Sequence, residues 1–165
     1  MDDHCDVEIE VNGQKVQRRV PARMSLVDFL RQELELTGSH VGCEHGVCGA
    51  CTVVIDGAIA RGCLVLAAQA SGARVRTIEG LSEVGEIADL QTAFHERNAS
   101  QCGFCSPGML VTAHDLLMRN AKPTRSDIRV AISANYCRCT GYEAIVDAIE
   151  RVADERTGGG NKAST

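Results

Sequence analysis

The stretch GCEHGVCGACTVVIDG, residues 42–57, sets the architecture of the first half of the chain. It opens as a loop with three glycines and three cysteines, Cys43, Cys48 and Cys51. An apolar run, TVVI, follows at once, and Asp56-Gly57 is the kind of pair that turns a strand back on itself. We therefore predict a glycine-rich loop that wraps closely around a compact group and leads directly into a β-hairpin.

A fourth cysteine beyond the hairpin completes a first cysteine set, whose spacing is C-x4-C-x2-C-x11-C. The members of the first cysteine set are Cys43, Cys48, Cys51 and Cys63. The first three match the plant-type ferredoxin pattern that ligates a [2Fe–2S] cluster. Gly42, Gly46 and Gly49 would let backbone N–H groups of the loop point at the sulfurs, which offsets the cost of burying an anionic cluster.

Two other metal sites fit this set less well. A zinc site usually has two similar C-x2-C knuckles rather than a crowded loop with a distant fourth cysteine. A Rieske centre would use His45, but it needs a second histidine where Cys51 stands. Thiols that merely pack together are the remaining alternative. We expect His45 to be a loop spacer and His40 a surface residue.

A second cysteine set lies in QCGFCSPGM, residues 101–109, and NYCRCTGY, residues 135–142. Its members, spaced C-x2-C-x31-C-x1-C, are Cys102, Cys105, Cys137 and Cys139. Each pair precedes a predicted helix, and the partial positive charge of a helix N-terminus favours thiolates. Cys-x-Cys is too tight for an easy disulfide, and a thioredoxin-like dithiol would need a βαβ context. The spacing predicts a metal or iron–sulfur site, and leaves Cys5 as an exposed thiol.

The first half of the chain reads as a small sheet with one helix. Asn12-Gly13 joins two alternating segments, 6–11 and 14–20, in a hairpin. A helix is predicted over 25–36, with Ser25 as its cap and Asp28 three residues on. The hairpin over 52–60 and a strand over 74–78 complete this part.

The second half is helical by its periodicity. Helices are predicted over 87–98, 107–120, 124–134 and 142–155. Ser106 is expected as an N-cap before Pro107, and Thr124 with Asp127 as a second capping pair. We expect an α+β chain with a ferredoxin-like domain over 1–80, a four-helix domain over 81–157 and a flexible tail over 158–165.

Composition restricts the function classes. The chain has 165 residues, with 17 Lys and Arg against 22 Asp and Glu, so its net charge of −5 argues against nucleic-acid binding. The chain has no Trp and only 3 Phe and 2 Tyr, so its core must be aliphatic. Such a small core is stabilised by an additional cross-link such as a bound metal. We see no signal peptide and no transmembrane segment, so we expect a reducing, cytoplasmic setting in which clustered cysteines bind metal rather than form disulfides.

Three motifs together, GCEHGVCGACTVVIDG, QCGFCSPGM and NYCRCTGY, resemble the iron–sulfur subunit of the molybdenum hydroxylases. This family includes xanthine oxidase, aldehyde oxidoreductase and carbon monoxide dehydrogenase, and the resemblance covers roughly residues 6–153. It implies a ferredoxin-like β-grasp domain, a four-helix bundle and a [2Fe–2S] cluster on each cysteine set. By this resemblance the first cluster lies towards FAD and the second towards the molybdopterin–molybdenum cofactor. Gln101 would hydrogen-bond the pterin, with Cys139 the ligand nearest to it.

The resemblance also implies partners. A chain of this length is similar to the split form of the family, with a large molybdenum subunit and a medium FAD subunit, assembled as a dimer of heterotrimers. The substrate would react on the large subunit, so we expect no catalytic residue here, only transfer of single electrons from the molybdopterin centre to FAD. The alternatives are a stand-alone two-cluster ferredoxin and a zinc-stapled interaction domain.

Overall fold

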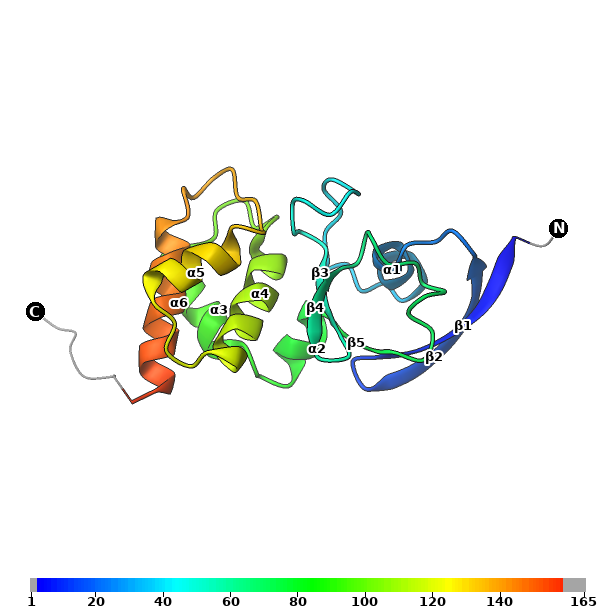
Figure 1. The fold of residues 1–165 in the computed structure, drawn as a ribbon, viewed down its shortest axis with the longest axis horizontal. Helices are drawn as coiled ribbons and strands as arrows, with labels where there is room; N and C mark the ends of the chain where they lie inside the picture. The colour runs from blue at the N-terminus through cyan, green and yellow to red at the C-terminus, as the bar shows by residue number, and fades with distance from the viewer. Residues whose placement is uncertain (1–2, 159–165) are drawn as a thin grey trace, which may run out of the picture.

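The computed structural model describes residues 3–158, and it is a mixed α/β structure. Its N-terminal half is a five-stranded sheet in the order β2-β1-β5-β3-β4, and its C-terminal half is helical (Figure 1). The expected tail, 158–165, lies outside the described residues except for Gly158. None of the helices within residues 3–158 combines the length and the apolar character needed to cross a membrane.

The first hairpin forms as predicted. Strands β1 (His4–Val11) and β2 (Gln14–Pro21) are antiparallel, and Ile9 stands opposite Val16. Asn12 and Gly13 take positive φ angles of 50° and 83°, which the tight turn requires. Alternation along β1 turns Val7, Ile9 and Val11 into the core.

Cys5 follows the same alternation, so the expectation of an exposed thiol is wrong. It lies on the inward face of β1, is partly buried, and packs against the N-terminal hydrophobic core. Its neighbour across the hairpin is Val20, which is itself buried.

The predicted helix over 25–36 is shorter than expected. It consists of α1 (Leu26–Asp28) and a π-helical segment, η1 (Phe29–Glu33). The Ser25 hydroxyl accepts a hydrogen bond from the Asp28 N–H, so the predicted cap is confirmed. The helix ends early because Glu35 takes a positive φ of 56°, which no helix continues through.

The remaining strands determine the position of the cysteine-rich loop. Strand β3 (Thr52–Ile55) pairs with β4 (Ala58–Arg61), and β5 (Arg74–Arg76) lies between β1 and β3. Because β3 starts immediately after Cys51, the loop over 42–51 projects from one end of the sheet, above β3 in Figure 1.

The helical half contains the four predicted helices and one more. These helices are α2 (Ile78–Glu83), α3 (Ala88–Glu96), α4 (Ser106–Arg119), α5 (Arg125–Ile132) and α6 (Glu143–Arg156). Thr124 and Asp127 form the predicted capping box at α5. No helix was predicted between residues 78 and 87, but Ile78 and Leu81 enter the helical core and make α2 a structural element. The expected boundary after residue 80 therefore falls inside α2.

The two halves pack against each other through α4. This helix contacts both β3 and β4, while α6 packs on α3 and α5. The helical core is built mainly from Val, Ile, Leu, Ala and Met, with Phe94 as a buried aromatic residue, in keeping with the shortage of aromatic residues. Arg125 on α5 pairs with Glu150 on α6, and Arg156 on α6 pairs with Asp89 on α3. The contact through α4 sets the position of one cysteine set relative to the other.

Candidate metal centres

The first cysteine set comes together as two pairs of thiols. Cys43 and Cys48 lie within the loop, and the Cys48 N–H donates to Cys43 Sγ at 3.4 Å. Cys51, at the start of β3, faces Cys63, which follows β4, and their side chains interact directly. The hairpin of β3 and β4 thus brings the distant fourth cysteine back to the loop. His45 is exposed, and its ring contacts the Cys43 carbonyl oxygen.

Backbone N–H groups favour an anion in this loop. The N–H groups of Cys48 and His45 point at the Cys43 sulfur and lower its pKa to about 6. Burial, followed by the neighbouring Cys51 thiol, raises the pKa of Cys63 to about 11. A metal bound here would displace a proton from Cys63, whereas Cys43 forms a thiolate more readily.

The second cysteine set is also arranged in two pairs. Cys105 lies beside Cys137, and Cys102 lies beside Cys139. Burial first, and then the Cys137 side chain, raise the pKa of Cys105 to about 12. Burial opposes ionisation of Cys137 as well, but hydrogen bonds from Thr140 leave the pKa of Cys137 lower than usual. The Cys102 side chain raises the pKa of Cys139.

The cap predicted for α4 is wrong by one residue. Cys105 occupies the N-cap position, Ser106 begins the helix, and Pro107 lies within the first turn. The Ser106 hydroxyl instead bonds to the hydroxyl of Ser100 at 2.8 Å. The consequence is that Cys105 stands directly at the positive end of α4, as the sequence analysis proposed for this cysteine pair.

Two residues of the second site were missed in the sequence analysis. The Thr140 hydroxyl donates to Cys137 Sγ at 3.1 Å, and the Tyr142 hydroxyl accepts from the Cys137 N–H at 2.8 Å. Tyr142 has a positive φ of 70°, and its hydroxyl reaches back to the cysteine loop through this bond. Both residues stand in the segment CTGY, which directly follows Arg138, so hydroxyl groups beside this cysteine pair could have been recognised from the sequence.

The two-by-two arrangement of thiols tests which metal group fits. A four-cysteine zinc site places all four sulfurs around one ion. A [2Fe–2S] cluster instead distributes its ligands over two irons. Both cysteine sets therefore fit a two-iron group better than a single zinc ion.

The loops of the two cysteine sets touch each other. The Tyr136 N–H donates to the Cys48 carbonyl oxygen at 2.8 Å. The His40 ring stacks on the Phe104 ring with centroids 4.7 Å apart, and its Nδ1 lies 2.7 Å from the Phe104 carbonyl oxygen. His40 is partly exposed, and beyond the expected surface position it links the two loops.

Apolar side chains surround the cysteine loops at the surface. Leu64 follows Cys63 and is 60% exposed, while Val47 is 46% exposed in the first loop. Tyr136 and Phe104, in the second set's loops, are 59% and 48% exposed. Gln101, the predicted pterin contact, is also exposed, next to Cys102. These exposed side chains border both candidate metal centres.

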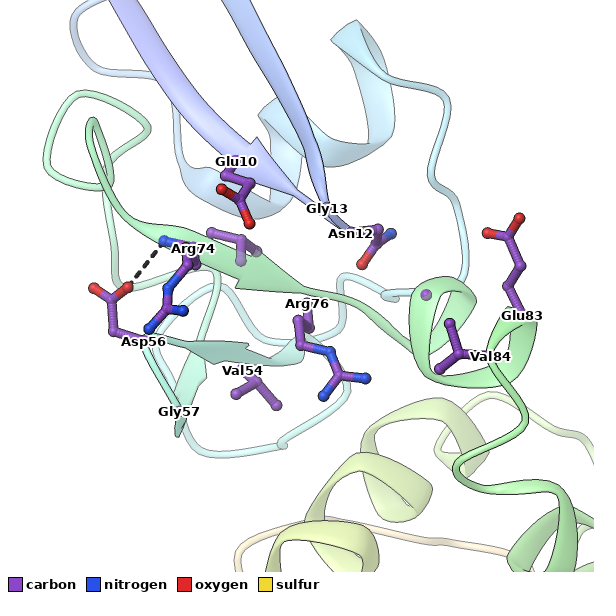
Figure 2. A pocket seen from close by; sticks show the side chains of 12 residues that line it. Glu10, Asn12, Gly13, Val54, Asp56, Gly57, Arg74, Arg76, Glu83 and Val84 are labelled. Atoms are coloured by element: carbon purple, nitrogen blue, oxygen red, sulfur yellow. Dashed lines mark hydrogen bonds between the residues drawn. The ribbon is translucent and has the colours of Figure 1, made fainter.

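A pocket on the sheet lies away from both cysteine sets (Figure 2). It forms at the far end of β3, around the turns at Asn12 and Asp56, with Arg74 and Arg76 in its wall. The Arg74 N–H donates to Asp56 Oδ1 at 2.9 Å, which ties β5 to the β3–β4 turn. No cysteine lines this pocket, so it is separate from the candidate metal centres.

Two family models match consecutive parts of the chain. Residues 9–76 match a 2Fe-2S iron-sulfur cluster binding domain, and residues 77–150 match a [2Fe-2S] binding domain. Each matched segment contains one complete cysteine set. The fold and these sites define a protein that carries two [2Fe–2S] clusters.

Characterised relatives then identify the family. The chain is 51% identical over 150 residues to caffeine dehydrogenase subunit gamma of Pseudomonas sp. (strain CBB1), covering 89% of this chain and 90% of the relative. It is 50% identical over 147 residues to the nicotine 6-hydroxylase small subunit of Paenarthrobacter nicotinovorans, covering 89% and 88%. The structure of quinoline 2-oxidoreductase from Pseudomonas putida 86 matches with a TM-score of 0.88 and 46% identity, over 95% of this chain and 99% of that one.

The chain belongs to the family of small iron–sulfur subunits of the molybdenum hydroxylases. It is an electron-transfer subunit of an oxidoreductase complex of this kind. The stand-alone ferredoxin is the less supported alternative, because the relatives matched over most of their length are subunits.

Proposed function

We propose that each cysteine set holds one [2Fe–2S] cluster. The ligands of the first would be Cys43, Cys48, Cys51 and Cys63, and those of the second Cys102, Cys105, Cys137 and Cys139. The observation that carries this assignment is the pairing of thiols two by two in each set. Each cluster, when bound, accepts and releases a single electron.

The protein supplies the environment that makes such groups stable. The N–H groups around Cys43 offset the negative charge of thiolate ligands. The loop glycines keep the backbone close to the sulfurs, and in Gly42 a Cβ would lie only 3.1 Å from Cys48 Sγ. Thr140 and Tyr142 orient Cys137 through its sulfur and its N–H.

We also propose that the chain divides into two domains, one for each cluster. Residues 1–80 would form a β-grasp domain with the first cluster, which the strand order β2-β1-β5-β3-β4 supports. Residues 81–157 would form a four-helix bundle of α3 to α6 with the second cluster, and α2 would link the two. The helical core common to α3, α4, α5 and α6 supports this division.

The route of electrons follows from which groups are exposed. Gln101, Cys102 and Cys139 lie at the surface, whereas Cys105 is buried. We place the molybdopterin–molybdenum cofactor of a large subunit against Gln101 and Cys139, and the FAD of a medium subunit beside the first cysteine set. Electrons from substrate oxidation would then pass singly through the second site and then the first.

The assembly we propose is a dimer of heterotrimers; the subunit names of caffeine dehydrogenase and nicotine 6-hydroxylase support a complex of several chains. We also propose a cytoplasmic location, because clustered cysteines that bind metal rather than form disulfides are more usual in a reducing compartment.

Metal analysis of the purified chain tests the assignment. We expect iron and acid-labile sulfide sufficient for two [2Fe–2S] clusters, and two distinct electron paramagnetic resonance (EPR) signals after reduction. Cys102→Ser or Cys139→Ser should remove one signal and retain the other, while Cys5→Ser should retain both. Zinc without sulfide would overturn the assignment, and so would two intact signals in Cys102→Ser. Native purification that yields only a monomer would favour the stand-alone ferredoxin.

A further inference from the structure

We infer that Asn135 is a positioning residue for electron transfer between the two metal centres. It holds the loop of the first cysteine set against the loop of the second, so that Cys48 stays hydrogen-bonded to Tyr136. The inference rests on the proposed function, because it takes Cys48 and Cys137 as ligands of different clusters. It adds a residue that is neither a cluster ligand nor a pterin contact.

Asn135 is buried at the junction of three segments. It is 1% exposed, and its Nδ2 donates to the Gly49 carbonyl oxygen at 2.9 Å. Its Oδ1 accepts from the Thr112 hydroxyl on α4 at 2.9 Å. One amide thus joins the first cysteine loop, the second cysteine loop and the helix between them. A buried amide with both ends bonded holds its neighbours in place, because breaking either bond leaves an unpaired polar group.

Close backbone packing at this junction restricts the two loops to one arrangement. Gly49 has a positive φ of 72°, and a Cβ there would lie 2.5 Å from both the Ala134 carbonyl oxygen and Asn135 Nδ2. Gly108, in the first turn of α4, has the Gly49 carbonyl oxygen against it on the other side, and a Cβ on Gly108 would collide with that oxygen. The junction therefore has no space for an alternative arrangement of the two loops with the amide bonds kept.

The consequence is a short connection between the two sites. Asn135 is followed by Tyr136, whose N–H donates to the Cys48 carbonyl oxygen at 2.8 Å, and then by Cys137. A route from Cys137 to Cys48 thus crosses one hydrogen bond and otherwise follows covalent bonds. With both clusters bound, this route would carry one electron from the second site to the first, so that the second is oxidised as the first is reduced. No bond forms or breaks, and no proton moves.

Other contacts between the loops are more exposed than Asn135. Phe104 of the His40 stack is 48% exposed, and Arg61, which donates to the Ala134 carbonyl oxygen at 2.6 Å, is only partly buried. Water can replace such contacts, whereas nothing replaces the amide of Asn135. Asn135 and its partner Thr112 are therefore the residues whose substitution should weaken the junction most.

The test uses the whole chain loaded with iron and sulfide, in four variants. Asn135→Asp removes the donor to Gly49, Asn135→Leu removes both bonds at similar volume, and Thr112→Val removes one bond and retains the amide. Asn120→Asp is the matched control, because Asn120 is an exposed residue at the end of α4. The measurement is the spin–spin splitting between the two EPR signals in the fully reduced chain, with each signal also recorded alone after partial reduction.

We expect both individual signals to persist in the Asn135 variants, and the splitting to narrow or vanish. In the assembled complex, electron transfer between the two sites should slow by about tenfold or more, the range for groups behind metal ligands. Thr112→Val should show a smaller change in the same direction, and Asn120→Asp none. A role in folding alone would lower thermal stability and leave the splitting of the folded molecules unchanged.

Full splitting and unchanged electron transfer in loaded Asn135 variants would overturn the inference. If the Asn135 variants do not fold, the Thr112→Val variant provides the test. An EPR splitting in Thr112→Val equal to that of the wild type would then overturn the inference. A wild-type chain without two signals would overturn the proposed function, and the inference with it. The inference is supported if the splitting is lost in the Asn135 variants and retained in the wild type and in Asn120→Asp.

Discussion

Thr140 shows how one hydroxyl can tune a metal centre from behind a ligand. Its Oγ1 donates to Cys137 Sγ at 3.1 Å, and such bonds stabilise the reduced, more negative form of a cluster. Thr140→Val should therefore lower the midpoint potential of the second centre. A bond with a net contribution of about 1 kcal/mol corresponds to about 40 mV for one electron.

A redox titration followed by EPR measures this shift. The first centre should keep its potential, because Thr140 contacts only the second site. Thr157→Val is a suitable control, since the Thr157 hydroxyl donates to the Ala153 carbonyl oxygen at the far end of α6. An unchanged potential in Thr140→Val would show that the hydroxyl does not act on the sulfur.

His114 on α4 makes stability depend on pH. Burial lowers the pKa of His114 below its usual value of 6.5, although Glu86 acts in the opposite direction. Arg76, Arg156 and Asp115 also face the ring. Its Nδ1 is buried and has no hydrogen-bond partner among residues 3–158, so the folded chain holds the ring neutral.

The sign of the effect follows from this lowered pKa. The unfolded chain binds a proton at His114 before the folded chain does, so stability falls as pH drops below about 6.5 towards the folded pKa. We expect the thermal unfolding midpoint to fall between pH 7 and pH 5, and to fall less in His114→Leu. His95→Leu, at an exposed site on α3, should behave as wild type. Equal pH dependence in His114→Leu and wild type would contradict this account.

At the scale of elements, the start of α4 joins the two halves of the chain. Gly108 stands in its first turn, against the Gly49 carbonyl oxygen. Gly→Ala inside an exposed helix usually stabilises by up to about 1 kcal/mol. Here the sign should reverse, because the new methyl group meets backbone that cannot move freely, and overpacking costs about 1–3 kcal/mol.

Chemical unfolding of Gly108→Ala measures this effect. Ser126→Ala, at an exposed position on α5, should change the free energy of unfolding by less than about 0.5 kcal/mol. A more stable Gly108→Ala chain would show that α4 does not press on the first cysteine loop.

Elements with local signals could be predicted from the sequence. The Asn12-Gly13 and Asp56-Gly57 hairpins and the four helices α3 to α6 follow from turn chemistry and periodicity within a few neighbouring residues. The short helix α2 was missed because its glycine and its six-residue length resemble a linker, and only tertiary burial of Ile78 and Leu81 reveals it. The premature end of the helix at Glu33 likewise depends on one backbone angle at Glu35.

The cysteine sets could be predicted for the same reason, since their spacing is a local pattern. The contacts of Asn135 and His40 could not, because they join segments 86 and 64 residues apart. Cys5 was misplaced although the alternation of β1 contained the information. Its odd position places it on the same face as Val7 and Ile9.

At the scale of the whole molecule, both metal centres lie at the same edge, where loops of the two halves meet. The loop before β3 and the loops before α4 and α6 project to one side in Figure 1. Exposed apolar side chains border these loops, and isolated apolar groups beside a redox site are suited to docking. We propose that this edge serves both electron transfer and assembly, and the two roles can be separated by mutation.

Leu64 is the side chain with which to separate them. It is 60% exposed next to Cys63, on the side of the first centre that we assign to the FAD subunit. Leu64→Glu places a charge where an apolar contact is expected, so affinity for that subunit should fall by about 10-fold to 100-fold, or about 1.4–2.8 kcal/mol. Both EPR signals should remain, because Leu64 is not a ligand. Val130→Glu, at a 71% exposed site on α5, is the matched control and should assemble normally.

Titration of the isolated chain against its partner subunits, with binding followed by calorimetry, measures the change. If Leu64→Glu bound as tightly as Val130→Glu, the apolar border of the first centre would not be a docking surface. If it lost a cluster signal instead, Leu64 would act on the loop itself. That second outcome has a structural basis, because Leu64 packs against Gly46 of the first cysteine loop. Measuring cluster content and affinity on the same sample therefore separates docking from support of the centre.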